Sequence, residues 1–171
     1  MDRYFNQDTS EIELFLDFMD QDLENVRRAV NDIEVNDIEA EFIVHAKAET
    51  VDESAENTGV EKDEIVKTLV FNAGEPVAVL CPGDKRVSEK KLSDITGEKV
   101  SMASPSEVRD STGYYVGGVS PFDLDIPVYM EESILDSERA KPAAGSRVVG
   151  VTLDPEDLKE LTDAEVVEVA E

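Results

Sequence analysis

The sequence is poor in the residues that build metal centres and disulfides. Its 171 residues include one cysteine, Cys81, one histidine, His45, and no tryptophan. A single cysteine excludes an internal disulfide and a zinc site built on cysteines. A single histidine likewise excludes a metal centre built on histidines. We therefore expect neither a metal nor another cofactor.

Long apolar runs are also absent. No run of about 18 apolar residues occurs, so no segment is predicted to span a membrane. The first residues, MDRYFNQDTSE, are polar and acidic, unlike a secretory signal. The expectation is a cytoplasmic protein without a membrane partner, and its length is that of one domain.

Basic residues are few. Sixteen Lys and Arg stand against 41 Asp and Glu, which gives a net charge of −25. Three explanations stay open: an acidic shell suited to very high salt, which we favour, a basic partner protein, or simple solubility. DNA is not expected as a partner, because phosphate binding needs Lys and Arg. In molar salt the Debye length is about 3 Å, so a local, shape-driven contact with nucleic acid stays open.

Residues 1–36 are predicted to form an amphipathic helix. Its apolar residues recur at steps of three and four: Ile12, Phe15, Leu16, Met19, Leu23, Val26 and Val30. This helix either packs on the domain or binds a partner. We place a helical extension at residues 1–38 and the main domain at residues 39–171.

Short strands and helices follow. Strands are expected at residues 41–45, 67–71, 76–80, 100–102, 126–130, 147–153 and 164–169, with the second and third forming a hairpin. Helices are expected at residues 61–66, 88–96, 105–112 and 155–161, and Thr50 with Glu53 has the form of a capping box. The last three helices have start signals at Ser88, Ser104-Pro105 and Asp154-Pro155, and Gly97 and Gly113 are expected to end the first two of them. This mixture predicts an α+β fold with a mixed, curled sheet.

Candidate chemistry centres on STGYYVGGVSPFDL, residues 111–124, where Gly117 and Gly118 are adjacent. Such a pair allows positive φ, and its bare N–H groups can bind an anion or an oxyanion. The alternative is a tight turn between strands. No nucleophile elbow, Cys–His pair or P-loop occurs. A hydrolase built here would use backbone donors, an activated water and the substrate itself.

Single residues add less. Lys67 begins an apolar run, so either its stem packs while the ammonium reaches water, or the ammonium holds a phosphate or carboxyl group. His45 has the position of an ordinary strand-end histidine. Cys81 is predicted to be a buried small hydrophobe, and Glu131 and Glu132 are predicted to be solvated.

Six motifs occur in a recognisable order: HAKAET (45–50), IVKTLVF (65–71), PGDKRVSEKKLSDITG (82–97), MASPSEV (102–108), STGYYVGGVSPF (111–122) and IPVYMEES (126–133). Together they resemble the YbaK/ProX family, free-standing relatives of the editing domain of bacterial prolyl-tRNA synthetase. KTL followed by TGYxVGGxSP is the most specific part. The resemblance covers about residues 45–169 and leaves out the N-terminal helix.

The resemblance implies a mixed, barrel-like sheet surrounded by helices. It implies metal-independent hydrolysis, in trans, of misacylated aminoacyl-tRNA carrying a small amino acid such as Cys or Ala on tRNA-Pro. The implied partners are the 3′ acceptor end of the tRNA and a prolyl-tRNA synthetase. The nucleophile would be a water, the ribose hydroxyl or a substrate thiol.

The resemblance also implies site residues. Lys67 would contact the terminal nucleotide, and the Gly117 N–H would lie near the scissile carbonyl. Substrate-binding residues are expected at His45, Thr68, Thr112, Gly113, Gly118, Ser120, Pro121, Gly145 and Ser146.

Four departures from the family pattern bear on specificity. Ala143 replaces a serine of cysteine-specific members, an aspartate is missing near Gly150, Glu131 replaces an aspartate, and Ile43 replaces a tyrosine. Alanine or another small residue is therefore as good a candidate as cysteine. Two other functions stay open: a non-catalytic module that binds tRNA or a synthetase, and an interaction protein that acts through its N-terminal helix.

Overall fold

The computed structural model describes residues 9–45, 55–56 and 59–171, with the side chains of α1 described from residue 19 onward. The predicted capping box at Thr50 and Glu53 lies outside these residues. The helices are α1 (Thr9–Val35), α3 (Glu89–Thr96), α4 (Pro105–Thr112), α5 (Pro155–Thr162) and the 3-10 helix η2 (Glu132–Asp136). The strands are β1 (Ala40–Val44), β2 (Ile65–Ala73), β3 (Glu75–Pro82), β4 (Ser101–Met102), β5 (Val128–Glu131), β6 (Lys141–Ser146), β7 (Val149–Leu153) and β8 (Glu165–Val167).

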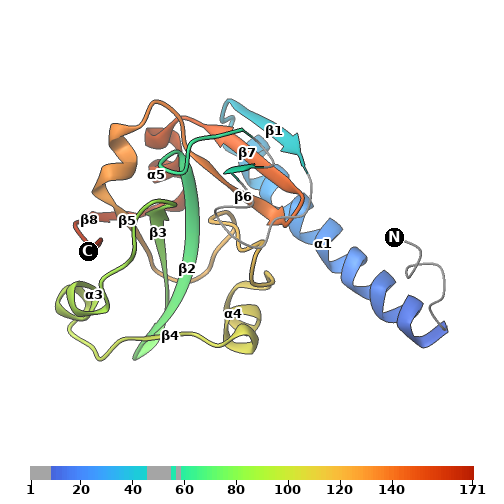
Figure 1. The fold of residues 1–171 in the computed structure, drawn as a ribbon, viewed down its shortest axis with the longest axis horizontal. Coiled ribbons are helices and arrows are strands. Elements are labelled where there is room, and N and C mark those ends of the chain that lie inside the picture. The colour runs from blue at the N-terminus through green and yellow to red at the C-terminus, as the bar shows by residue number, and fades with distance from the viewer. Residues whose placement is uncertain (1–8, 46–54, 57–58) are drawn as a thin grey trace.

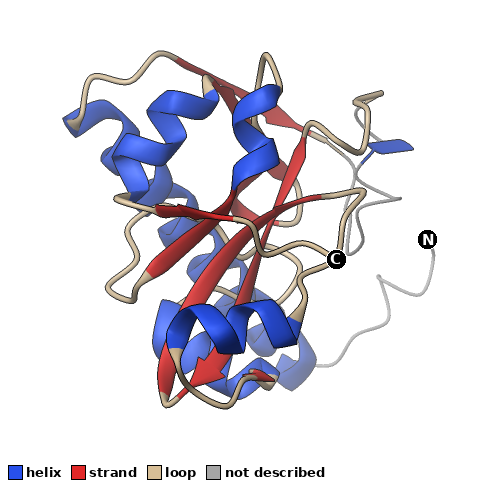
Figure 2. Cartoon of the chain, turned by 90° about the vertical axis from the view of Figure 1, so that its left-hand side faces the viewer, coloured by secondary structure: helices blue, strands red, loops and turns tan. Residues whose placement is uncertain are grey.

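One mixed sheet joins the strands in the order β1-β7-β6-β2-β3-β5-β8, with β4 beside β2. The pairs β2–β6, β3–β5 and β5–β8 are parallel, and the predicted β2–β3 hairpin is antiparallel. In the described part of the chain β1 and β8 do not pair, so the sheet is open. Helices surround it (Figures 1 and 2). The predicted α+β class and mixed sheet are confirmed.

The helices begin and end at the predicted capping signals. Ser88 and Ser104 each accept a hydrogen bond from the backbone N–H three residues later, and Asp154 caps α5. Gly97 and Gly113 end α3 and α4 with left-handed backbone angles that glycine adopts without strain. These ends are fixed by local sequence, which is why the sequence alone predicts them.

The β2–β3 hairpin separates two hydrophobic cores. One face of it, with Val66 and Leu80, packs against α1, α5 and η2. The other face, with Phe71 and Val79, packs against α3. Because side chains alternate along a strand, burial of both faces makes both strands almost continuously apolar. Cys81 is fully buried on β3, as predicted. Within the described residues, no helix is both long and apolar enough to cross a membrane.

Two predictions about helices are wrong in whole or in part. Residues 61–66 do not form a helix, because Ile65 and Val66 are buried in β2 and pair with the first residues of β6. β-Branched side chains fit such a strand better than a helix. The predicted apolar stripe of α1 is wrong in part: Met19 and Leu23 are about half exposed, at 50% and 52%, whereas Val26 and Val30 are partly buried. The side chains of Ile12, Phe15 and Leu16 lie outside the described part of the chain.

The buried face of α1 is formed by Asn25, Ala29 and Ile33, which are 0%, 0% and 3% exposed. These residues pack the second half of the helix onto the domain, so the packed interpretation holds for that half. The first half extends away from the sheet (Figure 1).

Glu131 corrects the prediction of a solvated side chain, because only 3% of it is exposed. One carboxylate oxygen accepts hydrogen bonds from the N–H groups of Val169 and Ala170, at 2.7 and 2.8 Å, and the other accepts from the Ser133 hydroxyl. Burial alone would raise the pKa of this carboxyl. The hydrogen bonds outweigh burial and hold the pKa below its ordinary value of 4.5. Glu131 therefore anchors the C-terminal residues to β5.

Glu131→Gln is expected to lower the free energy of unfolding near neutral pH by about 1 kcal/mol, because a neutral amide accepts hydrogen bonds less strongly than a carboxylate. Since the folded-state pKa is lowered, the unfolded chain binds more protons as the pH falls. The contribution of Glu131 is thus complete above pH 4.5 and is lost as pH falls through the folded-state pKa. Urea unfolding of both proteins along a pH series tests this. A difference that stays constant below pH 4.5 would contradict it.

Candidate functional site

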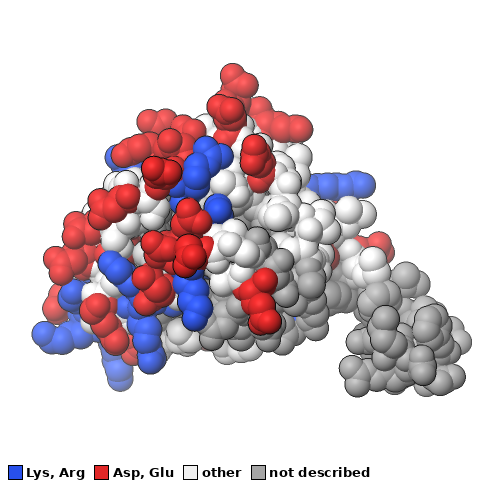
Figure 3. Space-filling view, turned by 45° about the horizontal axis from the view of Figure 1, so that its top comes forward, with Lys and Arg blue, Asp and Glu red and all other residues white. Residues whose placement is uncertain are grey.

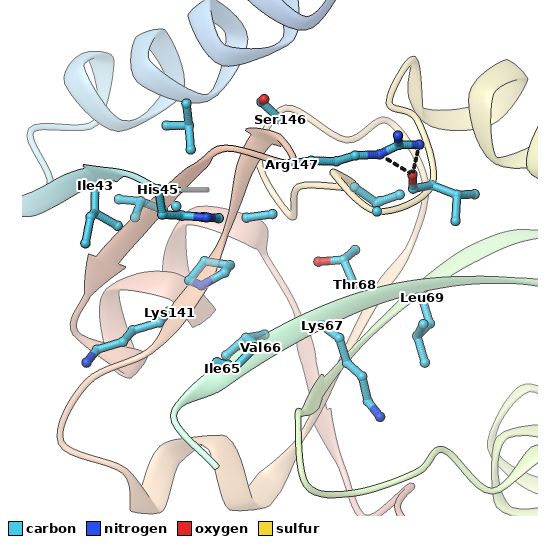
Figure 4. Close-up of a pocket in the computed structure, with 18 of the residues that line it drawn as sticks. Ile43, His45, Ile65, Val66, Lys67, Thr68, Leu69, Lys141, Ser146 and Arg147 are labelled. Atoms are coloured by element: carbon cyan, nitrogen blue, oxygen red, sulfur yellow. Dashed lines mark hydrogen bonds between the residues drawn. The ribbon is translucent and has the colours of Figure 1, made fainter. Parts of the chain in front are cut away.

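A cavity opens where β2 and β6 separate. The two strands pair only at Ile65–Lys141 and Val66–Pro142, and then diverge (Figure 4). The space between β2 and the β6–β7 hairpin has a volume of about 790 Å³. β1, the start of α4 and the glycine loop, which we define as residues 113–123, close its other sides. The cavity is therefore a consequence of the sheet topology.

The lining of the cavity is mostly apolar, with side chains that include Ile43, Val66, Val108, Val116, Val119 and Val149. Its charged residues are the basic Lys67, Lys141 and Arg147 and the acidic Glu41. Lys141 pairs with Glu64 outside the cavity at 3.1 Å. Basic residues outnumber acidic ones by three to one in the described lining, whereas the whole chain has a net charge of −25. Acidic side chains also outnumber basic ones on the face of the molecule in Figure 3. The described lining of the cavity is thus less acidic in composition than the chain as a whole.

Thr68 points from β2 into this cavity (Figure 4). Its side chain is 8% exposed, and its hydroxyl oxygen has no hydrogen-bond partner among the described residues. Buried polar groups are nearly always paired, because leaving one unpaired costs about 1–3 kcal/mol. An orphaned hydroxyl that faces a cavity is well placed to bind a ligand.

Lys67 borders the same cavity, but its side chain leaves β2 on the side opposite Thr68 (Figure 4). Its ammonium donates a hydrogen bond to the carbonyl oxygen of Lys85. Neighbouring residues of a strand point to opposite faces, so Lys67 and Thr68 cannot both project into the cavity.

Gly117 occupies a turn at the tip of the glycine loop. The Gly118 N–H donates to the Tyr115 carbonyl at 3.0 Å, and Gly117 has φ +96° at the position where such a turn favours glycine. Arg147 donates two hydrogen bonds to the Val116 carbonyl, at 3.0 and 3.3 Å. A β-carbon on Gly117 would lie 2.9 Å from the Arg147 Nε atom. Only glycine therefore fits beneath the guanidinium.

The same peptide unit carries the Val116 carbonyl and the Gly117 N–H. Because a trans peptide is planar, these two groups point in opposite directions, and Arg147 fixes both by holding the carbonyl. Within residues 9–45, 55–56 and 59–171 the Gly117 N–H donates to no acceptor. Gly117 and Thr68 both line the cavity, and neither the Gly117 N–H nor the Thr68 hydroxyl has a hydrogen-bond partner among the described residues.

The base of the glycine loop is closed by Tyr114, whose buried hydroxyl donates to the Phe122 carbonyl at 2.7 Å. Burial raises the pKa of Tyr114 to about 12, so the hydroxyl stays a donor at neutral pH. The Thr112 hydroxyl donates a hydrogen bond to the Val108 carbonyl, and the Ser120 hydroxyl accepts one from the Phe122 N–H. The loop is held at both its base and its tip.

Five of the eleven site residues predicted from the sequence line the cavity: His45, Lys67, Thr68, Gly117 and Ser146. The other six are not among the described residues that line it: Thr112, Gly113, Gly118, Ser120, Pro121 and Gly145. A β-carbon added to Gly118 would lie 3.0 Å from the carbonyl carbon of Ser146, so Gly118 packs closely against the β6–β7 hairpin. Ala143 and Gly150, two of the departures from the family pattern, line the cavity as well.

Sequence reasoning missed Arg147 as a site residue. It was considered only as the start of a strand, although it follows Gly145 and Ser146 directly in a chain with few basic residues. That scarcity was the available signal. In the described residues no three His, Cys, Asp or Glu side chains form a group that would hold a metal ion.

Comparison with known proteins identifies the family. The model of the aminoacyl-tRNA editing domain matches residues 45–161. EbsC of Enterococcus faecalis, whose name proposes a Cys-tRNA(Pro)/Cys-tRNA(Cys) deacylase, is 35% identical over 73% of this chain and 77% of its own. The proline–tRNA ligase of Maridesulfovibrio salexigens is 44% identical over 45% of this chain, which is 14% of the ligase.

A solved structure agrees with this. The crystal structure of a proposed trans-editing enzyme for prolyl-tRNA synthetase superposes with a TM-score of 0.77 at 29% identity, over 86% of this chain and 97% of that one. The chain belongs to the aminoacyl-tRNA editing domain family, which confirms the resemblance seen in its motifs.

Thr68→Val is expected to raise the free energy of unfolding by about 1 kcal/mol without ligand, because valine keeps the shape of threonine and removes the unpaired hydroxyl. Thr68→Ala is the control, since it removes packing as well as the hydroxyl and should lower stability. Urea unfolding measures both changes. A loss of stability in the valine variant equal to that in the alanine variant would contradict the unpaired state of the hydroxyl.

Proposed function

We propose that this chain, as a member of the aminoacyl-tRNA editing domain family, hydrolyses in trans the ester that joins a wrong, small amino acid to the 3′ end of a tRNA. The observation that carries the proposal is a pair of unused hydrogen-bond groups in one apolar cavity. These are the Thr68 hydroxyl and the Gly117 N–H. An ester needs such groups, one to orient it and one to stabilise its oxyanion.

The name of EbsC supports cysteine on tRNA-Pro as the substrate, and the other two names support a prolyl-tRNA synthetase as the enzyme whose errors are corrected. Alanine stays a candidate because of the departures from the family pattern at Ala143 and Gly150. Amino acids that differ by one small group are separated by only about 1–3 kcal/mol in a synthetase pocket. A second hydrolytic site is the physical remedy for that small difference.

In the proposed reaction a water oxygen bonds to the ester carbonyl carbon, and the carbonyl oxygen becomes an oxyanion. The bond to the ribose oxygen then breaks, and the ribose hydroxyl leaves with a proton that came from the water. The Gly117 N–H donates to the oxyanion in this scheme. Its direction is set before substrate arrives by Arg147 and by the turn bond from Gly118.

Lys67 is proposed to bind a phosphate of the terminal nucleotide. Its ammonium has three donors, and the Lys85 carbonyl uses one of them. Because Lys67 points away from Thr68, this contact lies outside the cavity and contributes to binding, not to the ester chemistry.

The test is a panel of misacylated tRNAs, with Cys-tRNA-Pro and Ala-tRNA-Pro first, in moderate and in molar salt. Wild-type protein should hydrolyse at least one ester. Thr68→Val should lower kcat/KM by about 10- to 100-fold, the cost of one lost hydrogen bond to the ester, while Thr68→Ser should retain activity. Gly117→Val should abolish hydrolysis, and Lys67→Ala should remove most of it through a higher KM.

The outcomes separate the open functions. An intact panel after treatment with folded wild-type protein would refute the proposal. Binding of the tRNAs without turnover, unaffected by Lys67→Ala, would favour the non-catalytic module instead. A Gly117→Val protein that fails only because it does not fold would count against the oxyanion role.

Hydrolysis is further proposed to be independent of metal ions, because every group assigned above is a hydroxyl, a backbone N–H or an ammonium. Dialysis against EDTA should leave the rate of deacylation unchanged within error. A loss that added Zn²⁺ or Mg²⁺ restores would overturn this part.

A further inference from the structure

Helix α1 lies outside residues 45–161, the part that matches the family, yet it contacts both walls of the cavity. On the β6 side, the Ser146 hydroxyl donates to the Asp22 carboxylate at 2.8 Å. Gly145 has φ +91° and packs directly on the helix, since an added β-carbon would lie 2.6 Å from the Asn25 carbonyl oxygen. The turn of the β6–β7 hairpin therefore rests on α1.

On the other side, α1 holds both ends of the glycine loop. At its start, the Asn25 side chain donates to the Gly113 carbonyl at 3.1 Å. At its end, Arg28 donates to the carboxylate and the carbonyl of Asp123, both at 2.9 Å, and Asp32 accepts from the Asp123 N–H at 2.9 Å. The Arg28 guanidinium also lies 4.2 Å from the centre of the Tyr114 ring.

These helix residues lie on one face because they follow helical spacing: positions 22, 25, 28 or 29, and 32 or 33. Ala29 and Ile33 supply the apolar packing of that face. The polar members add a requirement that apolar packing lacks. Asn25 is fully buried, and burial, ahead of the charge of Asp123, raises the pKa of Asp32. Because buried polar groups need matching partners, these hydrogen bonds favour a single position of α1 relative to the glycine loop.

We infer that α1 is a positioning element of the editing site, in which Arg28 acts through Asp123 and Tyr114 on the loop that carries Gly117. This rests on the proposed function. In the part of the chain that the structure describes, the hydrogen bonds and the ring contact of Arg28 are with residues that do not line the cavity, so its proposed effect is on the geometry of the loop. Small displacements of an oxyanion donor reduce turnover strongly, whereas substrate binding depends on other contacts.

Arg28→Met in the full chain is the direct test. Methionine keeps an apolar chain over Tyr114 but loses both hydrogen bonds to Asp123. The expected result is a fall in kcat of about tenfold with KM for the misacylated tRNA unchanged within about twofold. Arg28→Lys should restore part of the loss. Arg27→Met is the matched control, because Arg27 is exposed on the same helix and its replacement should leave kcat unchanged.

Asp123→Asn provides a second measurement, since asparagine tolerates the φ of +55° at this position. If Arg28 acts through Asp123, the double variant should lose no more kcat than the worse single variant. Additive losses, or a kcat for Arg28→Met equal to that of wild type, would overturn the inference. So would a fall in kcat that merely matches the unfolded fraction at the assay temperature.

Amide hydrogen exchange separates this inference from the proposed function. The Gly118 N–H bond to Tyr115 closes the turn, and its protection should fall in Arg28→Met but not in Arg27→Met. If wild-type protein hydrolyses none of the esters, the proposed function fails, and unchanged protection of Gly118 would then remove the positioning role as well.

Discussion

The site depends on one feature of the sheet: β2 and β6 pair for two residues and then separate. Because the pairing stops there, β2 and the β6–β7 hairpin diverge and leave the cavity that Thr68 lines. The separation is stabilised on the far side, where the β6–β7 hairpin has a register shift between Ala143 and Ser146 and a left-handed Gly145. A bulge of this kind bends a strand away from its neighbour. The shape of the cavity therefore depends on the β6–β7 hairpin and on helix α1, which packs against it.

The groups proposed to act on the ester are suited to that role because neighbouring residues fix their orientation. The Gly117 N–H is aimed by a peptide whose carbonyl is bound by Arg147, and the loop around it is fastened by Tyr114 below and by α1 at both ends. Donors that are already oriented need no reorganisation when charge develops on an oxygen. In the proposed reaction water is the nucleophile, and the contribution proposed for the protein is a backbone donor that is already oriented.

The sequence predicts what depends on neighbouring residues. The caps at Ser88, Ser104 and Asp154 and the β2–β3 hairpin are local, and their signals were read correctly. Glu131 was misread because its partners, Val169 and Ala170, lie 38 and 39 residues further on. The contacts of Asn25 and Arg28 span 88 and 95 residues, so no pattern within α1 reveals them. The motif KTL likewise predicts that Lys67 and Thr68 both belong to the site. It does not by itself show that they lie on opposite faces of β2.

A net charge of −25 does not conflict with an RNA substrate when the chemistry is arranged in this way. At physiological ionic strength the Debye length is about 8 Å, so acidic residues farther than that from a bound acceptor end repel it weakly. Three of the 16 basic residues, Lys67, Lys141 and Arg147, border the cavity, and the phosphate contact proposed for Lys67 lies on the other side of β2. The groups proposed to contact the ester, a hydroxyl and an N–H, carry no net charge, so salt screens their contacts little. An acidic shell suited to high salt stays a prediction, but a site whose essential contacts are neutral is the kind that would function inside such a shell.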